Sequence, residues 1–280
     1  MSQSDNKIDI FKYSGIFLII FGSLLLLINF LGKWTYLGNY KNRHQPRKWE
    51  RFDPDLVDKL DSFDSLKKYI SNKLSSDSTK RDIMKVLFDT VTNRFTHKRA
   101  SHNIFSNYIL YVMGKIHPAF AHIYNPKLMV SNGYSLLCSQ SSYLLLTLAL
   151  EYGVKGRHVG LFGHVVMEAW YDSDWHLYDP DLEVIPLNKN RDILSVEELA
   201  FNKKLLKKYY EKHNVSKIIK SRQNNTYMTY PAGANFNWKT NVLKYFEYFM
   251  EIFKFVFPVL IILVGIAFYS ISNSKKIFLL

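Results

Sequence analysis

The sequence contains a single cysteine, Cys138, among its 280 residues. The chain can therefore form neither an intrachain disulfide nor a zinc site built from several cysteines. Glycine and proline, at 12 and 8 residues, are too scarce for a collagen-like or low-complexity protein. Acidic residues are also few, since 24 Asp and Glu face 37 Lys and Arg and give a formal net charge of +13. This excess suits an anionic partner such as lipid headgroups, nucleic acid or a cell-wall polymer.

Hydrophobic residues are abundant, and charge is missing from a long stretch near each end of the chain. Hydrophobic side chains make up 48% of the sequence, which excludes an intrinsically disordered protein. Residues 13–32 carry no charge, and neither do residues 255–274. A helix of about 20 residues matches a hydrocarbon core of about 30 Å. We therefore predict transmembrane helices over residues 13–32 and, with an aromatic-rich entry, over residues 249–274.

Each of these two segments has an alternative interpretation. The first could be a cleaved signal peptide, but its apolar run is long and Lys33 and Trp34 follow it in place of a small-residue cleavage site. The second could be a core helix, because it is apolar all round. However, Lys275 and Lys276 follow it directly, as is typical of a membrane boundary. We therefore expect both segments to anchor the protein in a membrane.

Two spans place the tails 1–12 and 275–280 on the same side of the membrane. Lysines in both tails favour the cytoplasmic side for them. The basic linker 33–54 favours the opposite orientation. Long domains are translocated largely regardless of charge, so the linker decides less than the tails do. We therefore predict a two-pass integral membrane protein whose soluble domain is extracytoplasmic.

The region between the spans divides into three parts. Residues 33–54 form a polar juxtamembrane linker, residues 55–190 the main domain, and residues 191–248 a basic helical extension. Hydrophobic periodicity and capping residues predict helices over 54–75, 80–95, 104–116 and 195–222, with a turn at Asn125-Pro126.

The second half of the main domain combines one helix with three strands. Residues 138–153 indicate a buried helix that begins at Cys138 and stops at Gly153. Strand-like runs follow at 155–162, 164–171 and 175–179, and a polar turn separates the last two. The sequence therefore predicts an α+β fold in which a cysteine-bearing helix precedes an antiparallel meander.

Cys138, His164 and Asp179 are the candidate catalytic residues. At a helix start, the backbone N–H groups and the helix dipole favour a thiolate. His164 opens one strand and Asp179 ends its neighbour, so their side chains can meet on one face of the sheet. Asp179 would then orient the imidazole while His164 takes the thiol proton. The backbone N–H of Cys138 is a natural donor to an oxyanion.

The same residues resemble the transglutaminase-like superfamily, a branch of the papain-like fold. The pattern consists of Cys138 at a helix start, Gly153 at its end, Arg157 on the next strand, His164 with Glu168 four residues later, and Trp175 followed after three residues by Asp179-Pro180. The likeness covers about residues 80–185, and residue types, order and spacing agree together. One departure concerns Gly133, which lies five residues before Cys138 where the family has a glycine one or two residues before it.

The resemblance implies a papain-like α+β core, flanked here by two transmembrane helices. It implies a cysteine acyltransferase, or an amidase or peptidase, that acts on amide bonds of a protein or peptide through a Cys138 thioester. It implies neither a cofactor nor a metal. The alternative is a catalytically inactive, membrane-anchored binding or scaffold module that uses the same cleft. A nucleic-acid binder ranks last, because no nucleic-acid-binding module is recognisable.

Several other residues have structural interpretations beside functional ones. Glu168 shares a strand face with His164 and is either a site residue or a solvated one. We expect core or cleft-wall roles for Trp170 and Trp175, structural roles for His158 and His176, and no metal site at His117 and His122. The basic helix near residues 203–222 is a solvated face or contacts anionic lipid.

Overall fold

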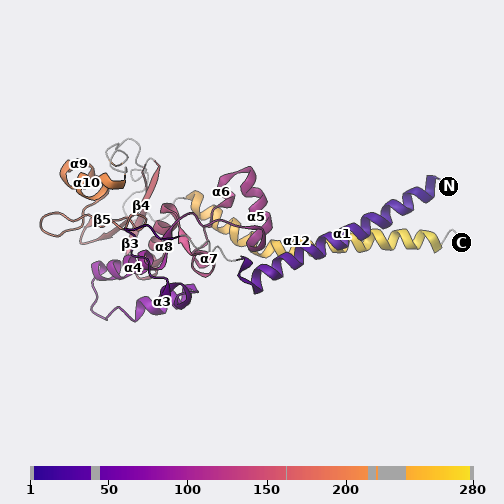
Figure 1. Ribbon diagram of the computed structural model, residues 1–280, viewed down its shortest axis with the longest axis horizontal. Helices are drawn as coiled ribbons and strands as arrows, with labels where there is room; N and C mark the ends of the chain where they lie inside the picture. Colours follow the sequence, from indigo (N-terminus) through magenta and orange to yellow (C-terminus); the bar gives the residue numbers. More distant parts are fainter. Residues whose placement is uncertain (1–2, 39–44, 162, 214–218, 220–237, 278–280) are drawn as a thin grey trace. The chain divides into compact units, whose positions relative to one another are not determined.

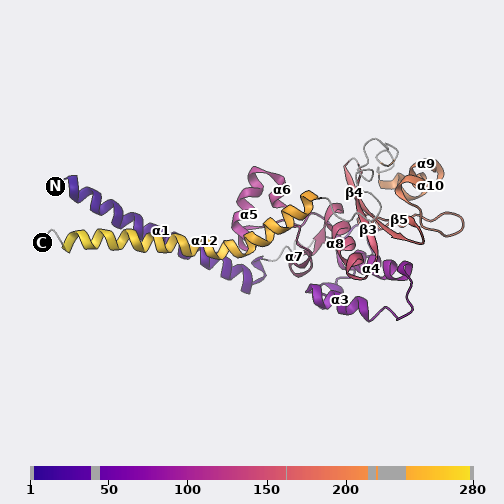
Figure 2. The ribbon, with the colours of Figure 1, turned by 180° about the vertical axis from the view of Figure 1, so that it is seen from behind.

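The computed structural model describes residues 3–38, 45–161, 163–213, 219 and 238–277 (Figures 1 and 2). It is a mixed helix and sheet structure, as the sequence predicts. The chain forms two compact units, which we call the helix-pair unit and the sheet unit. The helix-pair unit contains Met1–Asn39, His102–Ala121 and Phe246–Leu280, and the sheet unit contains Tyr40–Ser101 and His122–Tyr245.

Two long helices, α1 (Gln3–Trp34) and α12 (Trp238–Ile277), run antiparallel and side by side in the helix-pair unit (Figures 1 and 2). Glycines let their backbones approach closely. A Cβ atom on Gly15 would lie 2.7 Å from the Gly265 carbonyl oxygen, and one on Gly22 would lie 2.7 Å from an Ile262 side chain. Close contact through small residues is the usual way in which two helices associate in lipid.

The outward faces of this pair are apolar. Both segments, Ile10–Trp34 and Thr240–Asn273, are long and apolar enough to cross a membrane, and only 22% and 11% of their most apolar stretches are buried. The exposed side chains include Tyr13, Phe17, Leu24, Tyr248, Leu263 and Ile266. Because α12 is so exposed, the alternative of a buried core helix does not describe it.

A third helix, α5 (Ile104–Ile116), completes the packing of the helix-pair unit. It agrees with the predicted range 104–116 and ends before Pro118, as expected. Polar contacts join it to α12. In one of them, the Lys254 ammonium donates to the Ser106 carbonyl over 2.6 Å. The buried pair His102–Glu247, at 2.7 Å, adds a second contact. The short helices η1 (Tyr36–Gly38) and α6 (Pro118–Ala121) flank α5.

The helices that precede the sheet are α2 (Asp55–Lys59), α3 (Phe63–Ser71), α4 (Lys80–Arg94), α7 (Pro126–Asn132) and α8 (Cys138–Glu151). They share one hydrophobic core, in which α4 and α7 pack against α8. The predicted helix 54–75 is in fact two, because Ser62 adopts an extended conformation and caps α3. The predicted turn at Asn125-Pro126 instead starts α7, with Asn125 as its cap and proline in its first turn.

The sheet itself is the predicted antiparallel meander. Its strands β3 (Lys155–Leu161), β4 (His164–Tyr171) and β5 (Asp174–Tyr178) lie in the order β3-β4-β5. Asp172 and Ser173, with φ values of 50° and 62°, form the two-residue turn between β4 and β5. A separate parallel pair joins β1 (Thr96–His97) to β2 (Ser135–Leu136), so the chain before Cys138 is tied to the end of α4.

Helices cover the sheet on both faces. Met167 and Ala169 of β4 pack against leucines of α8, while Val166 faces the opposite way towards α9 (Val196–Phe201) and α10 (Lys203–Tyr210). The predicted helix 195–222 is interrupted at Asn202, which caps α10, and α10 is followed by the 3-10 turn η2 (Glu211–His213). Most of the rest of the predicted 191–248 extension lies outside the described residues.

Candidate active site

Cys138 is the first residue of α8, as the sequence predicts, and its thiol is half-buried. The first N–H groups of a helix have no acceptor within it. Here Gln140 N–H donates to the Leu137 carbonyl over 2.8 Å, so the N–H groups of Cys138 and Ser139 are the ones that can face an anion. Gln140 fixes this turn from inside the protein. Its side-chain oxygen accepts from the backbone N–H of Leu137 over 3.1 Å and of Ala100 over 3.0 Å. The cysteine is therefore held on a rigid helix start.

Gly133, five residues before Cys138, has a structural role. It follows α7, and a Cβ atom there would lie 2.1 Å from the Met129 carbonyl oxygen. The buried Arg94 guanidinium donates to the Gly133 carbonyl and to the Val130 carbonyl, each over 3.1 Å. Burial lowers the pKa of Arg94 to about 10. Gly133 therefore ends α7 and anchors the segment that leads to Cys138.

His164 and Asp179 lie together, as predicted. His164 is the first residue of β4, Asp179 follows β5, and the two strands are antiparallel neighbours. The His164 Nε2 and Asp179 Oδ2 atoms are 2.8 Å apart, and both side chains are buried. The Cys138 sulfur and a ring nitrogen of His164 are within 4.8 Å of each other. The three predicted residues are therefore brought into one group.

The environment of His164 favours its protonated form. Burial of the ring lowers the pKa, but the negative charge of Asp179 and hydrogen bonds with Asp179 and Cys138 raise it more. The pKa of His164 therefore lies well above its usual value. A protonated imidazole beside a cysteine is the arrangement in which a reactive thiolate forms most readily.

Asp179 is held by more than the histidine. The Tyr210 hydroxyl, from the end of α10, donates to Asp179 Oδ2 over 3.0 Å. The backbone N–H of Leu182 donates to Oδ1 over 3.1 Å. Burial, together with the charge of Asp179, raises the pKa of Tyr210 well above its ordinary value. Tyr210 therefore stays a hydroxyl donor, and it comes from the segment predicted to be a separate basic extension.

A second carboxylate, Asp181, also faces the group, and the sequence analysis above does not include it. Asp179 and Val184 exchange two backbone hydrogen bonds of 3.0 Å, and the tight loop between them turns Asp181 back towards the site. Asp181 Oδ2 is 3.8 Å from His164 Nδ1, the ring nitrogen that does not face Asp179. Burial raises the pKa of Asp181, although its contact with His97 opposes the shift. The signal available in the sequence was the Asp-Pro-Asp run at 179–181.

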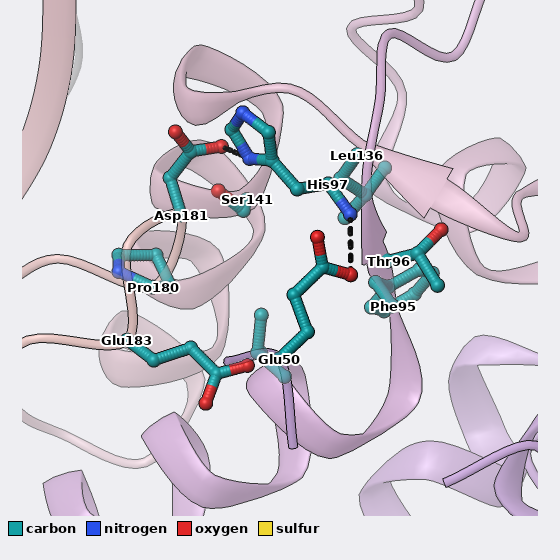
Figure 3. A pocket seen from close by; sticks show the side chains of 10 residues that line it. Glu50, Phe95, Thr96, His97, Leu136, Ser141, Pro180, Asp181 and Glu183 are labelled. Carbon is teal, nitrogen blue, oxygen red and sulfur yellow. Dashed lines mark hydrogen bonds and ion pairs between the residues drawn. The ribbon is translucent and has the colours of Figure 1, made fainter. Parts of the chain in front are cut away.

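His97 is the partner of Asp181. Figure 3 shows the Asp181 carboxylate pointing at the His97 ring, and Asp181 Oδ1 pairs with His97 Nδ1. The backbone N–H of His97 in turn donates to Glu50 over 3.3 Å. A cavity of about 10 Å³ lies among these side chains, next to Ser141 and Glu183. That volume is enough for about one water molecule.

The remaining candidates from the sequence have structural surroundings. Glu168 is buried against Arg157 over 2.7 Å and accepts from the Val196 backbone N–H over 2.7 Å, so it is not the solvated residue considered above. The Arg157 guanidinium lies 3.9 Å from the Trp175 ring centre, and Trp170 packs edge-on against Trp175. These contacts tie β3 to β4 and α9.

Three histidines outside the Cys138–His164–Asp179 group are buried or bonded to the backbone. His176 lies between the carbonyls of Ile193 and Tyr171, at 2.8 and 3.1 Å. Burial lowers the pKa of His158 to about 4, although a hydrogen bond with the Ser139 backbone opposes the shift. Burial and the charge of Arg99 lower the pKa of His122 to about 4. The predicted structural role of His158 and His176 agrees with these surroundings.

From the sequence we expect no metal site. Among the described residues, one group has the dimensions of such a site, because the ligand atoms of Cys138, His164 and Asp181 all lie within 4.8 Å of one another. This group includes neither His117 nor His122. The same two side chains, Cys138 and His164, therefore belong both to the candidate catalytic group and to a possible set of metal ligands.

Comparison of the chain with protein-family models, curated proteins and solved structures gives no match. What the protein does must therefore be inferred from the geometry of the site.

Proposed function

We propose that the chain is a membrane-anchored, transglutaminase-like cysteine enzyme that acts on amide bonds. Cys138 is the nucleophile, His164 the general base and acid, and Asp179 the residue that orients His164. The observation that carries this proposal is the 2.8 Å contact between His164 Nε2 and Asp179 Oδ2, with Cys138 beside the same imidazole. This arrangement leaves Nδ1 of His164 to exchange a proton with the thiol.

These three side chains, together with the backbone at the start of α8, supply the groups that amide cleavage needs. The Cys138 thiolate attacks the carbonyl carbon of an amide, and backbone N–H groups at the start of α8 bind the oxyanion. The C–N bond breaks as the His164 imidazolium gives its proton to the leaving amine, which produces a thioester on Cys138. In the second step His164 takes a proton from water or from a second amine, which attacks the thioester carbon. The C–S bond then breaks, so an acid or a new amide is released and the Cys138 thiolate and His164 imidazolium are restored. We propose a protein or peptide as the substrate.

The arrangement of elements supports a papain-like core. A helix that begins with the cysteine packs on an antiparallel sheet whose next strands supply the histidine and the aspartate, in that chain order. The same order of elements carries the resemblance to the transglutaminase-like superfamily. Tyr210 adds a donor behind Asp179, so the helices after residue 195 belong to the proposed catalytic domain.

The exposed apolar faces of α1 and α12 support a two-pass membrane anchor. Soluble proteins rarely leave contiguous apolar surface of this extent in water. We propose that the soluble domain lies on the extracytoplasmic side, with both termini in the cytoplasm. Resistance of the full chain to extraction by carbonate tests the anchor. Protease added to intact cells tests the side, because an extracytoplasmic domain should be digested without lysis.

Thiol labelling of the purified full chain in detergent tests the catalytic proposal. Cys138 is the only cysteine, so iodoacetamide incorporation reports this one residue. We expect fast labelling at neutral pH, at least tenfold slower labelling in His164→Ala, and none in Cys138→Ser. The exposed-site variant His117→Gln is the matched control. Slow labelling that His164→Ala does not change would contradict the enzyme proposal and leave the inactive binding module as the function.

A further inference from the structure

The group at the active site has the donor chemistry of a zinc site. It combines one sulfur, one imidazole nitrogen and one carboxylate oxygen, and all three ligand atoms lie within 4.8 Å of one another. Zn²⁺ takes these ligand types, and a site with three protein ligands leaves a fourth position for water or another ligand. This set differs from the proposed catalytic triad, because Asp181 replaces Asp179.

One pair of ligand atoms is already near the separation that the ion needs, and Cys138 Sγ lies within 4.8 Å of both. Zn–N, Zn–O and Zn–S bonds of about 2.0–2.3 Å in a tetrahedron place the donor atoms about 3.3–3.6 Å apart. His164 Nδ1 and Asp181 Oδ2 are already 3.8 Å apart. These two donors would therefore need to approach by only about half an ångström.

Both ligands that come from the sheet side have the outer partners typical of metal sites. A metal-bound histidine usually donates its other ring N–H to a carboxylate, which fixes its orientation. Here Asp179 holds Nε2 of His164 over 2.8 Å, so Nδ1, which faces Cys138 and Asp181, is the ring nitrogen that can bind a metal ion. A metal-bound carboxylate is also usually held by a hydrogen bond. Asp181 directs Oδ2 to His164, and its other oxygen pairs with His97. Figure 3 shows the pair with His97.

We infer that Zn²⁺ binds to Cys138 Sγ, His164 Nδ1 and Asp181 Oδ2 and thereby blocks the cysteine chemistry reversibly. The block rests on the proposed function, since the metal occupies the sulfur that would attack the amide and the nitrogen that would move the proton. The binding itself depends only on the three ligands. A chelator that removes the ion restores the free thiol.

The test measures metal binding separately from activity. The purified full chain in detergent is titrated first with Zn²⁺, in competition with a chromophoric chelator, and then with Co²⁺, whose spectrum reports tetrahedral geometry and sulfur ligation. We expect one ion per chain, an intense sulfur-to-cobalt charge-transfer band, and protection of Cys138 from iodoacetamide that EDTA reverses. Variants of the ligands, of an outer partner and of a distant histidine test the assignment of the site.

Cys138→Ser and Asp181→Asn should each weaken Zn²⁺ binding by tenfold or more. His97→Gln, which alters only the outer partner of Asp181, should weaken it by about tenfold. His117→Gln should bind as the wild type does. Absence of binding, or equal binding in Cys138→Ser or Asp181→Asn, would overturn the inference. If zinc binds as expected but the metal-free chain labels slowly and independently of His164, the proposed function fails while the metal site stands.

Discussion

Tyr210 donates its hydroxyl hydrogen bond to Asp179 Oδ2 over 3.0 Å, the same oxygen that faces His164 Nε2. The carboxylate is thus shared between a residue at the end of α10 and the imidazole that opens β4. A carboxylate with two donors on one oxygen has little freedom to rotate, so the orientation of His164 depends on a helix far away in the sequence.

Replacing Tyr210 by phenylalanine should therefore weaken catalysis without unfolding the domain. A hydrogen bond to a charged group contributes about 1.5–3 kcal/mol, and we expect a loss of about tenfold in the rate of Cys138 alkylation. The loss comes from a less fixed orientation of the imidazole. Without the Tyr210 donor, Asp179 also raises the pKa of His164 further, so the alkaline limit of the alkylation profile, where the imidazolium loses its proton, should move to higher pH. Tyr209→Phe, on the same helix but bonded to Leu187, is the control. An unchanged rate and pH profile in Tyr210→Phe would show that the bond only stabilises the fold.

The buried pair Arg157–Glu168 should matter for stability. Removing one partner of a buried ion pair leaves an uncompensated charge and costs about 3–5 kcal/mol. We expect Arg157→Ala to lower the free energy of unfolding by about this amount, and the double variant with Glu168→Gln to recover part of it. Lys155→Ala, at an exposed position of the same strand, is the control. Chemical denaturation measures the free energy of unfolding of the single variant, the double variant and the control. Equal stability of Arg157→Ala and Lys155→Ala would contradict this prediction.

Acid should destabilise the sheet unit through His158. The unfolded chain protonates this residue near pH 6.5, whereas the folded chain does so only near pH 4, because burial lowers the pKa. Unfolding therefore takes up a proton between these values, and the free energy of unfolding falls as the pH falls, by at most about 1.4 kcal/mol per pH unit. His158→Gln should flatten this part of the stability curve and His117→Gln should not. A parallel curve for His158→Gln and the wild type would exclude His158 as the cause.

The contact between Gly15 and Gly265 should decide whether α1 and α12 stay paired. The side chain of a leucine at Gly15 would clash with the Gly265 carbonyl oxygen, because a Cβ atom alone would already lie 2.7 Å from it. In a Cys138→Ser background, cysteines at Phe11 and Phe268, whose rings lie 5.5 Å apart, should react with a short bismaleimide in membranes. We expect Gly15→Leu to suppress this cross-link. Leu24→Phe, on an exposed face, should leave it unchanged, and equal cross-linking in both would contradict the close pairing.

Features that depend on neighbouring residues can be predicted from the amino-acid sequence. Uncharged runs of about 20 residues predict two apolar helices, because length and hydrophobicity suffice. The helix that begins at Cys138 and the meander after it follow from periodicity, Gly153 and the polar turn at Asp172-Ser173. A short hairpin then brings the end of β5 beside the start of β4. The proximity of His164 and Asp179 can therefore be predicted largely from residues close together in the sequence.

The residues that surround this pair are set by how distant segments pack in the folded chain. Asp181 reaches His164 because the loop after Asp179 reverses on itself. His97 reaches Asp181 because β1 pairs in parallel with β2, far along the chain. Tyr210 reaches Asp179 because α10 packs on the outer face of the sheet. No periodicity or motif encodes these contacts, because each depends on the burial of segments that meet only when the whole core has formed.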